Sequence, residues 1–312
     1  MDVSSRRGKI LVIRGGAIGD FILTLPVLVA LRRQFPQSHL EVLGYPHIMQ
    51  LALAGGLADD VKSIEARALA SFFARDGLLD ESFASYFAGF ALIISYLYDP
   101  DEIFQSNVAR CSAAQFIVGP HRPDEKLALH ATGVFLKPLE RLAIYDADPV
   151  PRLPINPQRS TLNRLALHPG SGSERKNWPE ENWMRLIQHL QTATQVGFLL
   201  VGGEAEAGRL RRLSAGFRAD RLELAQGLPL AELARRFQSC LGFIGHDSGI
   251  SHLAAALGLP VLVLWGEWNE TVWRPRGDRV TVIRSPEGLQ GLAVERVLDQ
   301  LRHFLPAGED AQ

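Results

Sequence analysis

The stretch LGFIGHDSGISHLAAALGLP, residues 241–260, decides the fold of this chain. Its apolar run Leu241–Ile244 predicts a buried strand, and a short polar turn separates this strand from a helix. The first turn of that helix contains the small residues Ser248, Gly249 and Ser251. A strand that runs directly into a helix is the unit from which parallel α/β sheets are built.

The start of this helix is also a candidate anion site. Its exposed N–H groups and its dipole favour a bound anion such as phosphate. His252 lies one turn further on, where it can point back to that anion. The simpler interpretation is an ordinary strand–helix joint with Asp247 as the helix N-cap.

A second anion-binding loop is predicted at residues 168–179, HPGSGSERKNWP, directly after the apolar strand Leu165–Leu167. Its glycines permit close approach of the backbone, Ser171 and Ser173 offer hydroxyl groups, and Lys176 offers a positive charge. The loop lacks the Gly-Lys-Ser/Thr element of a P-loop, and a surface loop with a solvated lysine is the alternative. Two phosphate-binding loops at the carboxyl ends of strands together indicate a diphosphate ligand.

Composition excludes several classes of protein. The chain has 312 residues, 46% of them hydrophobic, and a net charge of −1, which argues against nucleic acid as the main partner. Cys111 and Cys240 are too few for a disulfide framework and fit a reducing compartment. No apolar run approaches the roughly 18 residues of a membrane span. Arg14 interrupts the apolar N-terminal stretch, so we expect no signal peptide and a cytoplasmic location.

Strands and helices alternate along the whole chain, which predicts parallel sheets with helices on both faces. The strands predicted in the first half are Ile10–Ile13, Leu40–Leu43, Val61–Ile64, Leu92–Ser95 and Phe116–Val118, and the clearest helix is Phe21–Phe35. The strands predicted in the second half are Leu165–Leu167, Phe198–Val201, Leu222–Leu224, Leu241–Ile244, Val261–Leu264 and Val280–Ile283, with helices at Glu180–Gln191 and Val294–Phe304.

Prolines mark a boundary between the two halves. Pro149, Pro151, Pro154 and Pro157 cluster in a stretch that is typical of an interdomain linker. We therefore expect an α/β protein of two doubly wound, Rossmann-like domains, with a cleft at the carboxyl ends of both sheets. The expected boundaries are 1–147 for the first domain, 148–161 for the linker and 162–312 for the second domain.

The loop after the first strand, RGGAIGDF at residues 14–21, matches the dinucleotide fingerprint G-x-G-x-x-G only in part. Gly16 and Gly19 take the second and third glycine positions, but Arg14 takes the first. The acidic residue expected at the end of the second strand is also missing, since that strand ends Val-Leu-Gly. An NAD-dependent oxidoreductase is therefore a weak alternative.

Asp20 at the end of this loop has two interpretations. It can be the N-cap of the helix that begins at Phe21. It can also be a general base, because a carboxylate at the carboxyl edge of a parallel sheet faces the expected cleft. A carboxylate bound to helix amides is a weaker base, so the two roles are compatible only in part.

With these motifs in order, the chain resembles the heptosyltransferase family of inverting glycosyltransferases, family 9, which has the two-domain GT-B fold. The resemblance rests on ILVIR at 10–14 with IGD at 18–20, on HPG at 168–170 with KNWP at 176–179, and on GGE at 202–204, DSG at 247–249 with HLAA at 252–255, and VWRPRG at 272–277. Each motif is modest by itself, and their order and spacing together are specific.

The resemblance implies transfer of a sugar, typically heptose from ADP-heptose, to a growing lipopolysaccharide core or a related glycan. It implies Asp20 as the catalytic base and Glu204 as a contact to the ribose of the donor. The residues implied to bind the donor are Ser171, Ser173, Lys176, Glu204, Asp247, Ser248, Gly249 and His252. A helix N-terminus, hydroxyl groups and a lysine can stabilise a leaving diphosphate without a metal, so we expect neither a metal nor a cofactor.

Two Asp-x-Asp elements, Asp99-Pro100-Asp101 and Asp146-Ala147-Asp148, test that expectation, because metal-using glycosyltransferases need such an element. The first is more typical of a helix start with acids in its opening turn, and the second lies at the linker. His246 and His252 are six positions apart, which is not the spacing of a zinc-binding pair on a helix.

One loop departs from the family pattern. Gly266-Glu267-Trp268-Asn269 stands where the family often has Gly-Pro-Thr-Asp, which leaves the identity of the donor open. The expected partners are a nucleotide-diphospho-sugar donor and a glycolipid or oligosaccharide acceptor, without nucleic acid. Peripheral contact with the cytoplasmic face of the inner membrane stays open, as does a catalytically silent nucleotide-sugar-binding protein of the same fold.

Overall fold

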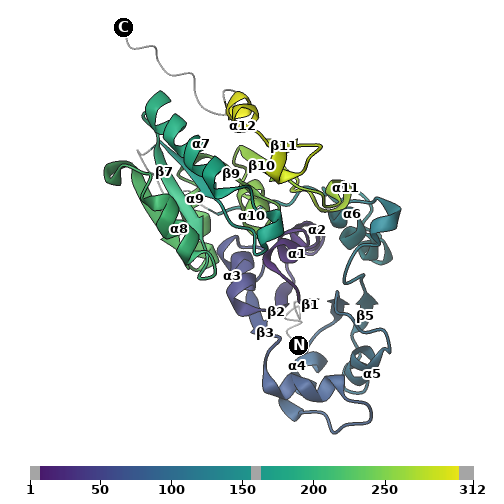
Figure 1. Cartoon of the computed structure of the whole chain (residues 1–312). Coiled ribbons are helices and arrows are strands. Elements are labelled where there is room, and N and C mark those ends of the chain that lie inside the picture. The colour runs from purple at the N-terminus through teal and green to yellow at the C-terminus, as the bar shows by residue number, and fades with distance from the viewer. Residues whose placement is uncertain (1–7, 156–162, 302–312) are drawn as a thin grey trace. The chain divides into compact units, whose positions relative to one another are not determined.

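The computed structural model describes residues 8–155 and 163–301 (Figure 1). The chain divides into two compact units, Met1–Leu153 (unit 1) and Pro154–Gln312 (unit 2). Residues 156–161 of the predicted linker 148–161 lie outside the described part, so the linker stays a prediction. Among the described residues no helix is both long and apolar enough to cross a membrane.

Unit 1 contains a parallel sheet in the order β3-β2-β1-β4-β5. Each predicted strand of this half is present to within one residue at either end, because buried strands of a parallel sheet are near-continuous apolar runs. The sequence order reverses between β1 and β4, so ligands are expected beyond the carboxyl ends of these two strands. The strands are β1 (Lys9–Arg14), β2 (His39–Gly44), β3 (Asp60–Ser63), β4 (Leu92–Ser95) and β5 (Gln115–Val118).

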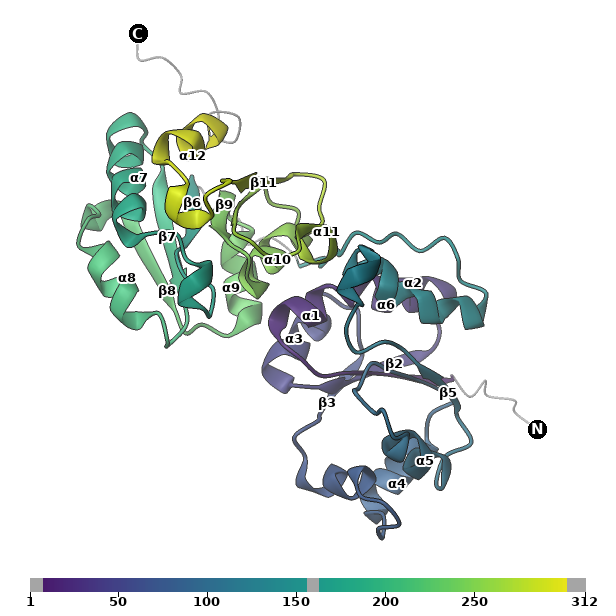
Figure 2. The same ribbon diagram turned by 45° about the vertical axis from the view of Figure 1, so that its right-hand side comes forward.

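Helices cover both faces of this sheet. Figure 2 shows α4 and α5 on one side, and α1, α2, α3 and α6 on the other. Aromatic side chains of α4, of α5 and of the 3-10 turn Arg67–Phe73 pack on the sheet in one apolar cluster that includes Phe72, Phe83, Phe87 and Phe104. The helices are α1 (Ile18–Ile22), α2 (Leu25–Gln34), α3 (Pro46–Ala54), α4 (Glu81–Ala88), α5 (Ile103–Ala109) and α6 (Ala131–Leu136), with the 3-10 turns η1 (Arg67–Phe73), η2 (Glu125–Leu127) and η3 (Lys137–Leu142).

The prediction of one helix over Phe21–Phe35 is wrong, because two helices, α1 and α2, occupy this segment. Pro26 lies in the first turn of α2. Proline has no N–H, and its ring collides with the carbonyl group four residues earlier, here that of Ile22, so a helix cannot continue through it. Because the apolar pattern continues across the break, the pattern alone predicts a single helix.

Unit 2 contains a second parallel sheet in the order β11-β10-β9-β6-β7-β8. Its predicted strands are present to within two residues. The reversal point lies between β6 and β9, where His168 and Gly245 are register partners. The strands are β6 (Arg164–His168), β7 (Gly197–Gly202), β8 (Leu222–Gln226), β9 (Cys240–His246), β10 (Val261–Trp265) and β11 (Val280–Arg284).

One apolar cluster holds α7, α8 and α12 on one face of this sheet, and α9 and α10 lie on the other (Figure 2). Trp178 and Trp183, both fully buried, lie in that cluster. The predicted helix Val294–Phe304 is described only to Leu301. The helices are α7 (Glu180–Ala193), α8 (Ala207–Ser214), α9 (Leu230–Phe237), α10 (Gly249–Ala256), α11 (Glu270–Trp273) and α12 (Val294–Leu301), with the 3-10 turns η4 (Glu174–Lys176), η5 (Ala219–Arg221) and η6 (Leu289–Gly291).

Candidate functional site

The two predicted anion-binding loops meet in unit 2. One loop follows β6 and the other follows β9, and these strands are neighbours at the reversal point of the sheet. In open α/β sheets this point is where ligands bind. Sheet topology therefore brings together segments that lie about 70 residues apart in the sequence, as the contact between Lys176 and Asp247 shows.

Lys176 is the centre of these contacts. Its Nζ lies 2.5 Å from Oδ2 of Asp247, and both side chains are partly buried. The same Nζ lies 4.5 Å from the ring centroid of Trp268, at cation–π distance. Trp268 is an exposed residue of the loop after β10, and its carbonyl oxygen accepts a hydrogen bond from Nε1 of Trp265 at 2.8 Å. Residues from two other loops thus contact the ammonium group that the loop after β6 supplies.

The loop after β6 is held in a tight conformation by its own polar groups. Oγ of Ser171 lies 2.9 Å from the carbonyl oxygen of Ser173 and 2.7 Å from Oδ1 of Asn177. Gly172 has a φ of +72°, which favours glycine. Ser173 is exposed, so its hydroxyl group is accessible to a ligand.

Asp247 is not the N-cap of the helix after β9, because this helix begins one residue later than that interpretation requires. Ser248 is the N-cap of α10, and its side chain accepts a hydrogen bond from the N–H of Ser251. Gly249 is therefore the first helical residue, and Asp247 is left to pair with Lys176. His252 is buried inside α10 at this end of the helix.

Two buried histidines, one at the end of β6 and one at the end of β9, stabilise the two loops. Nε2 of His246 accepts a hydrogen bond from the N–H of Trp178 at 2.9 Å, so Nδ1 carries the proton and donates to the carbonyl oxygen of Gly170 at 3.3 Å. Burial lowers the pKa of His246 to about 3 and that of His168 to about 4. Both rings are therefore neutral at pH 7. No role was predicted for His168 or His246, although a histidine at the end of a buried apolar strand can indicate a buried hydrogen-bonding group at a ligand site.

A pocket of about 330 Å³ lies beside the loop after β6. Glu206 lines it, whereas Glu204, the acid predicted to contact the ribose, is exposed and does not. Oε2 of Glu206 accepts a hydrogen bond from the N–H of Gly203 at 2.9 Å. A Cβ on Gly170 would lie 2.5 Å from Cγ of Glu206, so only glycine permits this approach. The pocket is lined by Gly172, Ser173, Glu174, Asn177, Ala205, Glu206, Gly208, Arg209 and Arg212.

In unit 1 the loop after β1 places Asp20 at the third position of α1, with Ala17 as the N-cap residue. The interpretation of Asp20 as an N-cap is therefore wrong, although its Oδ2 does accept a hydrogen bond from the N–H of Ala17 at 2.9 Å. The side chain of Asp20 is 31% exposed, and its Oδ1 lies 3.5 Å from the guanidinium group of Arg14. A Cβ on Gly16, whose φ is +98°, would lie 2.7 Å from Oδ2 of Asp20.

Arg14 is the buried support of this loop, with 2% of its side chain exposed. It donates a hydrogen bond to the carbonyl oxygen of His121 at 2.8 Å and lies 4.4 Å from the ring centroid of Phe135. Burial lowers the pKa of Arg14, and the charge of Asp20 opposes this change. A buried guanidinium group therefore faces the carboxylate that is the candidate base.

Three of the four acids in the Asp-x-Asp elements have structural partners. Asp99 accepts hydrogen bonds from the N–H groups of Phe104 and Gln105 at 3.1 and 3.0 Å, at the start of α5. The prediction that the first element lies in the opening turn of a helix is wrong, because α5 begins at Ile103, after both acids. Asp101 lies 3.4 Å from Arg75, and Asp148 lies 3.3 Å from Arg152.

Comparison with known proteins connects this geometry to a family. The model of glycosyltransferase family 9 (heptosyltransferase) matches residues 144–297, which include the loops that surround Lys176. This part of the chain is a glycosyltransferase family 9 domain. Lipopolysaccharide heptosyltransferase 1 of Escherichia coli (strain K12) is 32% identical over 127 residues, which cover 40% of this chain and 39% of that relative.

Solved structures extend the likeness over nearly the whole chain. A family 9 glycosyl transferase from Veillonella parvula DSM 2008 has a TM-score of 0.78 at 18% identity, covering 96% of this chain and 97% of its own. The E. coli heptosyltransferase WaaC with ADP has a TM-score of 0.76 at 19% identity, covering 95% of this chain and 100% of its own. These likenesses confirm the predicted fold class, GT-B with two Rossmann-like α/β domains.

Proposed function

We propose that this protein is an inverting, metal-independent glycosyltransferase. It transfers a sugar from a nucleotide-diphospho-sugar to a lipopolysaccharide-core or related glycan acceptor, with heptose from ADP-heptose as the first candidate donor. The observation that carries the proposal is the meeting of Lys176, Asp247 and Trp268 at the reversal point of the second sheet. The names of the family 9 relatives, which are heptosyltransferases, support the choice of sugar.

The donor diphosphate is assigned to the two loops of unit 2. Lys176 supplies the positive charge, Ser171, Ser173 and Ser248 supply hydroxyl groups, and Gly249 supplies an N–H group at the start of α10. Asp247 orients the ammonium group of Lys176 through their ion pair. His252 completes the predicted set at the same helix end.

The ribose of the donor is assigned to the acidic segment after β7. Glu204 is the predicted contact, and it is exposed beside the pocket that Glu206 lines. Because the two acids lie on either side of Ala205, substitution of each in turn identifies the one that binds. Glu204→Gln and Glu206→Gln are therefore a matched pair of variants for donor affinity.

Asp20 is assigned the role of general base. In an inverting transfer the acceptor hydroxyl attacks the anomeric carbon as the nucleotide diphosphate leaves, and one group must accept the hydroxyl proton. Asp20 has a partly exposed carboxylate in the first turn of α1, just after the loop that follows β1. Charge that develops on the leaving diphosphate is stabilised by Lys176 and the start of α10, which is why no metal is required.

The remaining partner assignments follow from this reaction. The acceptor is a glycolipid or oligosaccharide. If the acceptor is linked to a lipid, the enzyme acts at the cytoplasmic face of the inner membrane and makes peripheral contact with that membrane. No nucleic acid and no cofactor take part.

A binding screen followed by a transfer assay tests the proposal. Thermal shift with ADP-, UDP-, GDP- and dTDP-sugars should give the largest stabilisation with one nucleotide-sugar, and ADP-heptose is the expected one. Release of ADP in the presence of acceptor should follow. Binding without release would favour a silent nucleotide-sugar-binding protein, and stabilisation by NAD alone would favour the oxidoreductase alternative.

A further inference from the structure

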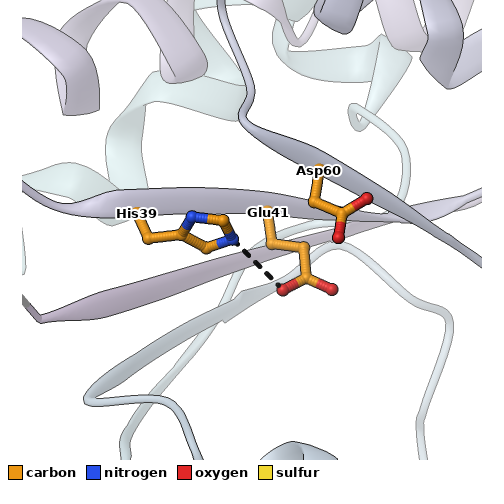
Figure 3. Close-up of side chains that lie close together, drawn as sticks. All are labelled: His39, Glu41 and Asp60. Atoms are coloured by element: carbon orange, nitrogen blue, oxygen red, sulfur yellow. Dashed lines mark ion pairs between the residues drawn. The ribbon is translucent and has the colours of Figure 1, made fainter.

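A group of three metal-ligating side chains lies in unit 1, at the end of the sheet away from Asp20. His39 and Glu41 are two residues apart on β2, so they share one face of the strand. Asp60 begins β3 and is the register partner of Glu41. One ligand atom from each residue lies within 4.8 Å of the other two. Figure 3 shows both carboxylates on the same side of their strands, with the imidazole ring beside Glu41.

The buried carboxylate of Glu41 lacks a strong cationic partner. Its side chain is 7% exposed, and its ion pair with Nε2 of His39, at 3.7 Å, is longer than a hydrogen bond. In the part of the chain that the structure describes, no lysine or arginine forms an ion pair with Glu41. The ammonium groups of Lys9 and Lys62 lie over the rings of Phe90 and Tyr86. A buried carboxylate beside a second carboxylate is unfavourable unless a cation neutralises it.

The imidazole ring of His39 lies between the carboxylates of Asp59 and Glu41, at distances that are both longer than a hydrogen bond. Nδ1 of His39 lies 3.8 Å from Oδ2 of Asp59, and Nε2 is left to face Glu41. Asp59 is itself fixed, because it pairs with Arg32 at 2.6 Å and accepts a hydrogen bond from the N–H of Leu40 at 2.8 Å. A carboxylate behind the second ring nitrogen is the usual outer partner of a metal-bound histidine.

A buried hydroxyl group supplies independent support. Oη of Tyr86, on α4, is buried and makes no hydrogen bond to any described residue. Nζ of Lys62, which lies two residues after Asp60 on β3, is 4.3 Å from the ring centroid of Tyr86, so the phenol ring packs on this part of the sheet. An unpaired buried hydroxyl group is costly, and a ligand or its bound water would supply the missing partner.

We propose that His39, Glu41 and Asp60 bind a divalent transition-metal cation such as Zn²⁺. One imidazole nitrogen with two carboxylate oxygens suits Zn²⁺, whereas Mg²⁺ and Ca²⁺ prefer sites made of oxygen alone. The three side chains leave a coordination position for water. The metal joins edge strand β3 to β2 and supports the sheet. This site is independent of the proposed sugar transfer.

Calorimetric titration of Zn²⁺ into the metal-stripped full chain tests the site. One binding event is expected, and His39→Ala, Glu41→Gln and Asp60→Asn should each weaken it by more than about 100-fold, because loss of an outer partner alone costs 10- to 100-fold. Asp59→Asn should fall in that smaller range. His189→Ala removes an exposed histidine of unit 2 and is the matched control, which should bind as the wild type does.

Three results would overturn the site. The first is no Zn²⁺ binding by the wild type, which would leave His39 and Glu41 as a simple ion pair. The second is binding that survives Asp60→Asn, a change at an exposed residue that should not disturb folding. The third is Mg²⁺ binding of equal strength with the same dependence on the variants, which would mean an unspecific acidic site. Circular dichroism of each variant checks that it is folded.

Discussion

At the scale of single residues, the ammonium group of Lys176 connects most of the donor assignments. It contacts Asp247 from the loop after β9 and Trp268 from the loop after β10. Neither neighbour is close to it in sequence. The sequence alone predicted that the loops of Lys176 and Asp247 bind the same diphosphate, but not that the two side chains contact each other. Their contact depends on the strand order β10-β9-β6, which local sequence does not encode.

Lys176→Ala should weaken binding of the nucleotide-diphospho-sugar. Loss of one charge-assisted contact is worth about 1.5–3 kcal/mol, or roughly 10- to 150-fold in affinity. Lys137→Ala is the matched control, because Lys137 is an exposed lysine of unit 1 that pairs with Glu140. Calorimetry with the donor checks both variants, and unchanged affinity in Lys176→Ala would remove Lys176 from the site.

Trp268 should influence donor binding through Lys176. Its exposed ring holds the ammonium group at cation–π distance, a contact worth about 0.5–1 kcal/mol at such a site. Trp268→Ala should therefore weaken donor affinity by roughly two- to fivefold. Trp268→Phe should restore most of it, because it keeps an aromatic ring. Equal affinities for all three proteins would show that Trp268 does not act on Lys176.

At the scale of elements, strands were easier to predict than loops. Every predicted strand is present to within two residues, because buried parallel strands are apolar along their whole length. The break between α1 and α2 was missed, because the apolar pattern continues across Pro26. The positions of Asp20 and Asp247 at their helix starts were each wrong by one to three residues, since several small or polar residues there can cap a helix equally well.

Glu206 is a further residue, here in the donor site, whose position could not be predicted from the local sequence. Glu204 and Glu206 both follow β7, and the sequence offers no reason to prefer the second. The hydrogen bond from Gly203 and the contact with Gly170 turn Glu206 toward the pocket. His246 was likewise unassigned, because its partners Trp178 and Gly170 come from another loop.

The two buried histidines at the ends of strands β6 and β9 should make the free energy of unfolding depend on pH. His168 and His246 are neutral when folded, with pKa values lowered to about 4 and about 3, whereas an unfolded histidine titrates near pH 6.5. As pH falls below about 6.5 the unfolded chain takes up protons that the folded chain does not. Stability is therefore highest above pH 6.5 and falls as the pH is lowered toward 3–4.

The slope of that loss is at most about 1.4 kcal/mol per pH unit for each histidine. Urea unfolding at pH 7.5 and at pH 5 measures it, and His246→Gln should reduce the difference between the two values. A wild-type stability that is the same at both pH values would contradict the neutral, buried state of these rings.

At the scale of the whole molecule, the assigned roles fall in both units. The donor residues all belong to unit 2, and Asp20 belongs to unit 1. Sugar transfer therefore needs both units, whereas donor binding should depend on unit 2. The family model matches residues 144–297 and so does not include Asp20, which makes the assignment of the base the step that most needs a test.

Chelation should leave transfer unchanged. The leaving diphosphate is assigned to Lys176, hydroxyl groups and the start of α10, and Asp99, Asp101 and Asp148 of the Asp-x-Asp elements have other partners. Full activity is expected in excess EDTA, even where EDTA removes a metal from His39, Glu41 and Asp60, because that group lies at the other end of the strands. Loss of activity that Mg²⁺ or Mn²⁺ restores would instead indicate a catalytic metal.

The most direct test of the account is the transfer rate of Asp20→Asn at saturating donor, with donor affinity measured in parallel. Asparagine keeps the size of the side chain and can still accept the hydrogen bond from Ala17, so folding and donor affinity should stay close to those of the wild type. Without a carboxylate to accept the acceptor's proton, turnover should fall by about 10²–10⁴. A folded, donor-binding Asp20→Asn that transfers sugar at close to the wild-type rate would contradict the account.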